Sequence, residues 1–137
     1  MGRFKVPIVR LAYDSDGSRE PLKKAIELLK AHRYDGRRII VYCLFNHNDT
    51  PETFFHRDRD LIDWGVVAYP MRYEPPEPRP KNTYVAPAWT SERLEMVAQA
   101  RRVIGYGGAF PPYEGLRIKF ARARNFAEAF SLRPAQR

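Results

Sequence analysis

The chain has 137 residues, of which 44% are apolar and 13% aromatic, and its formal net charge is +8. These values fit one globular domain and exclude a wholly disordered chain. The single cysteine, Cys43, excludes an internal disulfide and an iron–sulfur cluster held by this chain alone. The N-terminal segment lacks the apolar core of a signal peptide, and no apolar run is long enough to cross a bilayer. We therefore expect a cytoplasmic protein without a transmembrane helix.

The first half of the chain alternates apolar, β-type segments with segments of helical periodicity. The pattern predicts three strands, at residues 6–13, 38–45 and 66–73. The helices between them are expected to end at Gly36 and Gly65, because glycine favours the left-handed conformation found just beyond a helix. Pro70 lies inside the third strand and predicts a place at the sheet edge, because proline cannot donate to a neighbouring strand.

The second half predicts helices joined to this core by an extended, proline-rich connection. Further helices are expected at residues 91–104 and 116–130. The short joints between strands and helices require parallel strands and right-handed crossovers. We therefore expect an α/β fold in which three parallel strands alternate with helices, as in part of a TIM-type barrel, followed by C-terminal helices. The whole chain, 1–137, is expected to form a single domain with a core at 6–75, a proline-rich connection at 76–90 and a helical part at 91–137.

Polar residues gather where the predicted strands end, and parallel sheets bind their ligands at that end. The loop at residues 46–49, with the sequence NHND, either caps the following helix or contacts a ligand. Arg10 and Arg72 lie within apolar strands, where a charge must be paired or must face a cavity. Each arginine is therefore expected to pair with an acid, such as Asp14 or Glu74, or to bind a ligand carboxylate or phosphate.

The segment from the second strand to the third carries a specific pattern of residues. Residues 41–52 read VYCLFNHNDTPE, Arg57 follows in the next helix, and that helix ends in WGV at residues 64–66. The third strand reads YPMRY at residues 69–73. This pattern resembles the second half of the barrel of radical S-adenosylmethionine (SAM) enzymes, and the resemblance covers residues 6–75.

The resemblance implies part of a SAM-binding surface. By position it implicates seven residues: Arg10, Asp14, Leu44, Asn46, Asn48, Met71 and Arg72. The family holds its iron–sulfur cluster on three closely spaced cysteines, in the half of the barrel that this chain lacks. The resemblance therefore implies SAM as the candidate ligand and an iron–sulfur cluster only if a partner chain supplies it. The chain alone is not expected to be catalytic.

A half barrel leaves strand edges unpaired, and such edges invite pairing with another chain. We expect a homodimer, or assembly with a complementary chain that supplies the missing strands. Because Pro70 protects the third strand, the available edge is expected at residues 6–13.

The charge distribution supports an alternative hypothesis, a small basic protein that binds nucleic acid or another phosphate-rich partner. Residues 101–137 hold eight basic and two acidic residues. The expected contacts are Arg117, Lys119, Arg122 and Arg124, although a solvated helix face explains the same pattern. An enzyme using Asp14, His47 and Asp49 is the weakest hypothesis, because no nucleophile and base can be assigned. No metal site is predicted.

Overall fold

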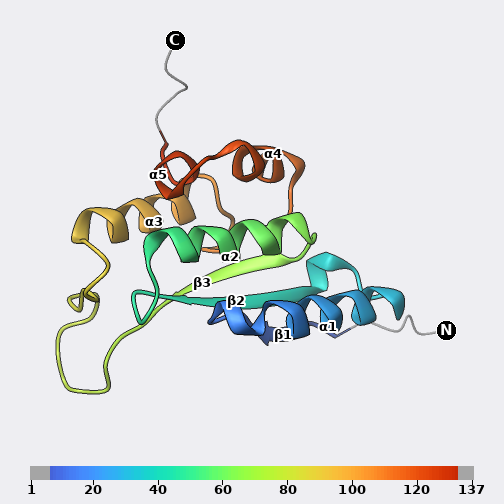
Figure 1. The fold of residues 1–137 in the computed structure, drawn as a ribbon, viewed down its shortest axis with the longest axis horizontal. Coiled ribbons are helices and arrows are strands. Elements are labelled where there is room, and N and C mark those ends of the chain that lie inside the picture. The colour runs from blue at the N-terminus through green and yellow to red at the C-terminus, as the bar shows by residue number, and fades with distance from the viewer. Residues whose placement is uncertain (1–6, 133–137) are drawn as a thin grey trace, which may run out of the picture.

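The computed structural model describes residues 7–132. Three strands form one parallel sheet in the order β1-β2-β3, with bounds β1 (Val9–Ala12), β2 (Ile39–Phe45) and β3 (Val67–Arg72). The helices are α1 (Arg19–Ala31), α2 (Pro51–Asp63), α3 (Ser91–Val103), α4 (Glu114–Arg122) and α5 (Phe126–Ala129), and short 3-10 turns lie at Asp16–Ser18 and Gly36–Arg38 (Figure 1). The α/β class, the parallel strands alternating with helices and the edge position of the third strand are confirmed.

The predicted helix at residues 116–130 is wrong, because the chain forms two helices there. Ala123 ends α4 in extended conformation, and Asn125 then caps α5 by accepting a hydrogen bond from the backbone N–H of Glu128. The Glu128 carboxylate accepts in turn from the backbone N–H of Arg124. These two side chains accept hydrogen bonds from backbone N–H groups at the break between α4 and α5. The apolar periodicity of the sequence does not reveal this break.

The first helix also ends earlier than expected, at Ala31 rather than near Gly36. Gly36 has another role, which is to let two backbones approach. A Cβ atom at this position would lie 1.7 Å from the carbonyl oxygen of Gly65. Gly65 itself follows α2 with φ +77°, the left-handed conformation that was expected at that helix end.

The two connecting helices lie on the same side of the sheet, as right-handed crossovers in the order β1-β2-β3 require. On that side the β2 side chains are fully buried: Ile39, Val41, Cys43 and Phe45. Arg19 joins α1 to α2, since its Nε lies 3.0 Å from Asp60 Oδ2, and Tyr13, directly after β1, donates to the same oxygen at 2.9 Å. α3, α4 and α5 form a further layer over α2 (Figure 1).

No helix of the described chain packs along the other side of the sheet, where the one helix side chain with a ring contact is Arg101 of α3, whose guanidinium lies 5.3 Å from the ring centre of Tyr69. We call this side of the sheet the open face, and its strand residues are Arg10, Ala12, Ile40, Tyr42, Leu44, Val67, Tyr69 and Met71. All are half-buried or exposed, and Met71 is 45% exposed. The rings of Tyr42 and Tyr69 lie 5.4 Å apart and shield one another in part. Parallel sheets normally have both faces covered, whereas the helices of residues 7–132 cover one face of this sheet.

The two edges of the sheet differ. Ala68 of β3 exchanges two backbone hydrogen bonds with Phe110, at 3.0 and 2.7 Å, and this bridge covers the outer edge of β3. Within residues 7–132, no strand pairs with the outer edge of β1. No helix of the described part of the chain has the length and apolarity needed to cross a membrane.

One carboxyl group lies in the core between α2 and the sheet. Asp58 is 0% exposed, and neither of its carboxyl oxygens accepts a hydrogen bond from the described residues. Burial raises the pKa of Asp58 to about 8, against the opposing influence of Arg57, Cys43 and Arg101. Asp58 is therefore protonated in the folded protein at neutral pH, because a neutral carboxyl is less costly to bury than a carboxylate.

We expect Asp58 to make the protein less stable as the pH rises. An unfolded aspartate has a pKa of about 3.9, so the folded state holds the extra proton up to about pH 8. Between these values the group lowers the free energy of unfolding by about 1.4 kcal/mol per pH unit. Urea unfolding from pH 5 to 8 should show this slope, and Asp58→Asn should reduce it. The exposed control Asp63→Asn should keep it; an equal slope in all three proteins would contradict the assignment.

Candidate functional site

The loop after β2 begins with a buried asparagine. Asn46 has φ +65° and is 0% exposed. Its Oδ1 accepts from the backbone N–H of Ala86 at 2.7 Å, and its Nδ2 donates to the carbonyl oxygen of Tyr84 at 2.9 Å. The side-chain amide of Asn46 thus bonds to the backbone of residues 84–86 and holds this part of the proline-rich connection against the end of β2.

Asp49, at the end of the same loop, joins three separate parts of the structure. Its Oδ1 accepts from the backbone N–H of His47 at 3.0 Å and from the indole Nε1 of Trp89 at 2.9 Å. Its Oδ2 lies 3.0 Å from Nη2 of Arg57, and the two side chains are 7% and 2% exposed. The next residue, Thr50, starts α2 with a capping box shared with Thr53. Of the two roles expected for this loop, helix capping and ligand contact, helix capping is thus observed, at Thr50.

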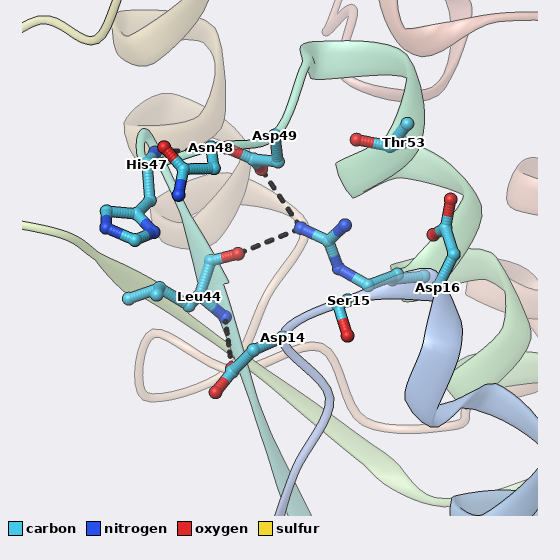
Figure 2. Close-up of a pocket in the computed structure, with 9 residues that line it drawn as sticks. Asp14, Ser15, Asp16, Leu44, His47, Asn48, Asp49 and Thr53 are labelled. Carbon is cyan, nitrogen blue, oxygen red and sulfur yellow. Dashed lines mark hydrogen bonds and ion pairs between the residues drawn. The ribbon is translucent and has the colours of Figure 1, made fainter.

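A pocket of about 180 Å³ opens beside this loop, at the carboxyl end of β2 (Figure 2). Nine residues line it: Asp14, Ser15, Asp16, Leu44, His47, Asn48, Asp49, Thr53 and Arg57. They come from the segment after β1, from β2 and its loop, and from α2. Parallel strands bring such segments together at one end of the sheet, where α/β proteins bind ligands.

The polar groups of the pocket are of both signs. Nη2 of Arg57 donates to the carbonyl oxygen of Leu44 at 2.9 Å, in addition to its bond with Asp49. Asp14 accepts a long hydrogen bond, 3.4 Å, from the backbone N–H of Leu44. Asp14 and Asp16 are exposed carboxylates, whereas the guanidinium of Arg57 is buried in the pocket wall. The site can therefore offer both acceptors and a cationic donor to one ligand.

Three of the seven residues implicated by the SAM resemblance line this pocket: Asp14, Leu44 and Asn48. The other four lie outside it. Asn46 is occupied by backbone groups of the connection, and Arg10 and Met71 are exposed on the open face. Arg72 donates to the carbonyl oxygens of Asn82 and Tyr84 at 3.2 and 3.0 Å.

Neither strand arginine has the acidic partner that was considered for it. Arg72 is held by backbone carbonyls of the connection, and Arg10 extends from β1 at the exposed side of the sheet. The sequence did not assign four pocket residues to a site, Ser15, Asp16, Thr53 and Arg57, and Arg57 is the buried one. It lies eight residues after Asp49 in the sequence, and the ion pair arises because the loop places Asp49 beside the first turns of α2.

The basic residues considered for nucleic acid are mostly engaged within the chain. Nζ of Lys119 donates to the carbonyl oxygen of Ser131 at 3.0 Å, and Arg124 pairs with Glu128 at 2.7 Å. Arg117 lies 4.0 Å from the carboxylate of Asp63. Arg122 is exposed at the end of α4. These contacts neutralise part of the positive charge of this surface.

Comparisons with known proteins found no counterpart. No family model matches the chain, and neither the curated proteins nor the solved structures contain a match. Among the described residues, no group of three or more His, Cys, Asp or Glu side chains is placed to hold a metal ion.

We expect Asp49 to be the side chain on which the pocket wall depends. Asp49→Asn leaves an acceptor for Trp89 but removes the charge that pairs with buried Arg57. Breaking a buried ion pair on one side costs about 3–5 kcal/mol of unfolding free energy. Denaturant unfolding would measure this loss. Asp14→Asn, an exposed carboxylate of the same pocket, is the matched control and should change stability by less than about 0.5 kcal/mol. Similar values for both variants would contradict the role given to Asp49.

Proposed function

We propose that this chain is one part of a composite barrel and that it contributes a ligand site at the carboxyl ends of its strands. The observation that carries the proposal is the open face of the sheet. Helices lie on one side of three parallel strands, which is the arrangement of a barrel wall. In a complete barrel, side chains of the remaining strands fill the interior against such a face. In this proposal a partner chain provides them.

The edge of β1 is the place where such a chain would join. The opposite edge, at β3, is occupied by the bridge from Ala68 to Phe110. Val9 and Leu11 of β1 are only half-buried on the helix side, where a further strand would cover them. The partner is a second copy of this chain or a complementary chain, because either could pair with a free strand edge.

The proposed ligand is SAM, on the strength of the sequence resemblance to radical SAM enzymes. Asp14, Leu44 and Asn48 are implicated by that resemblance and lie in one pocket. The pocket volume, about 180 Å³, is below the roughly 300–1,000 Å³ typical of sites for drug-sized ligands. The chain would therefore hold one part of the ligand, and the partner would complete the site.

The reaction belongs to the assembly in this proposal, not to the isolated chain. Radical SAM chemistry needs an iron–sulfur cluster, and Cys43, the one cysteine, is fully buried. The cluster would come from the partner chain. The alternative, binding of nucleic acid through the C-terminal helices, is less favoured because Lys119 and Arg124 already have acceptors within the chain.

Calorimetric titration with SAM tests the ligand assignment. We expect saturable binding that is weakened by Asn48→Ala, because Asn48 lines the pocket. Gln99→Ala, an exposed amide on α3, is the matched control and should bind like the unmodified chain. Absence of heat at about 1 mM SAM, which corresponds to a binding free energy weaker than about −4 kcal/mol, would contradict SAM as the ligand of this chain. Equal binding by both variants would contradict the pocket.

A further inference from the structure

Arg57 is a buried cation whose hydrogen-bonding capacity is only partly used. The side chain is 2% exposed, and Nη2 donates to both Leu44 and Asp49. Nε is buried without a hydrogen-bond partner among the described residues. A guanidinium carries five N–H donors, and leaving a donor unpaired away from water is costly. Nε is enclosed by the protein, so the donor that a ligand acceptor can reach is Nη1, which makes no hydrogen bond with the described residues, on a side chain that lines the pocket.

Carboxylates with free acceptor capacity line the same pocket. Figure 2 shows Asp14 and Asp16 on the segment that follows β1, across from the loop that carries Asn48 and Asp49. Asp16 makes no side-chain hydrogen bond or ion pair with the described residues, and Asp14 makes one long hydrogen bond, at 3.4 Å. Asp49, by contrast, already has three partners. The pocket thus combines a donor at Arg57 with acceptors at Asp14 and Asp16.

This pairing of charges selects for one class of ligand. A simple anion would meet Arg57 but would be repelled by Asp14 and Asp16. A simple cation would meet the two carboxylates but would leave the free donor of Arg57 without an acceptor. A molecule that carries both charges a few bonds apart is complementary to both kinds of group.

We infer that the pocket binds the zwitterionic head of an α-amino acid. The ligand carboxylate accepts hydrogen bonds from Arg57, and the ligand ammonium donates to Asp14 or Asp16. A volume of about 180 Å³, below the roughly 300–1,000 Å³ of sites for drug-sized ligands, suits a ligand as small as the head group with a short side chain. This inference rests on the proposed function only in using the same pocket, and it does not require that SAM be the ligand.

The test is a titration of the full chain, followed by the backbone amide signals in NMR spectra. The probes are L-alanine, L-alaninamide, which lacks the carboxylate, and propionate, which lacks the ammonium group. We expect L-alanine to shift the signals of Asp14, Ser15, Asp16 and Asn48 in a saturable way. The two analogues should bind at least about tenfold more weakly, because each loses one charge-assisted contact.

Variants at the exposed side of the pocket keep the test independent of folding. The double variant Asp14→Asn, Asp16→Asn alters side chains that are exposed in the structure, and it should weaken L-alanine binding by about tenfold or more. Glu77→Gln, an exposed carboxylate in the proline-rich connection, is the control and should bind like the unmodified chain.

The outcomes separate this inference from the assignment of SAM. Binding of L-alanine without binding of SAM would support the amino-acid site and end the proposal for SAM. Equal shifts with all three probes, unchanged affinity in the double variant, or no saturable shift at about 50 mM L-alanine would overturn the amino-acid site. In that case binding of SAM, if it occurs, would have to use other groups of the chain.

Discussion

The loop between β2 and α2, residues 46–50, holds the sheet, the second helix and the proline-rich connection together. Asn46 bonds the backbone of residues 84–86 to the end of β2. Asp49 binds the indole of Trp89 with one oxygen and the guanidinium of Arg57 with the other. The two side chains satisfy backbone and buried polar groups that would otherwise lack partners, which is why small polar residues occupy this loop. The same contacts build one wall of the pocket.

The second constraint is that the sheet is covered on one side only. Right-handed crossovers put α1 and α2 on one face, and the C-terminal helices pack outside α2 rather than against the open face (Figure 1). Apolar and aromatic side chains of β2 and β3 therefore remain half-buried or exposed, with Met71 at 45%. The bridge at Phe110 protects one edge of the sheet, and β1 has no such cover in the described chain. The proposed association would use this open face and the free edge, and the pocket lies at the carboxyl end of the same strands.

Much of the fold could be predicted from local sequence patterns. Apolar runs predicted the three strands, and Pro70 predicted the edge position of β3 because its effect on hydrogen bonding is local. The break between α4 and α5 could not be deduced from periodicity, because it depends on side chains that cap the backbone at Asn125 and Glu128. The end of α1 was misplaced because Arg33, rather than a glycine, takes the left-handed conformation after the helix, with φ +69°, and the N–H of Tyr34 closes the last turn on the carbonyl oxygen of Leu29.

The pocket was only partly predictable for a similar reason. Residues at strand ends were correctly expected to meet, and Asp14, Leu44 and Asn48 do so. Asn46 follows the same strand, yet its partners are Tyr84 and Ala86 in a segment with no pattern that indicates its path. Arg57 lies in the middle of a helix, where an arginine is usually solvated. Its burial follows from its contacts with Asp49 and the carbonyl of Leu44, and these depend on the tertiary structure.

If the open face is an association surface, its solvent exposure must fall as the concentration of the chain or of its partner rises. Hydroxyl-radical footprinting would follow oxidation of Met71 on the open face, with Met96 on α3 as an internal reference. We expect oxidation of Met71 to slow relative to Met96 as the concentration of the chain, or of an added complementary chain, is raised. A constant ratio of the two rates under all these conditions would contradict association through this face.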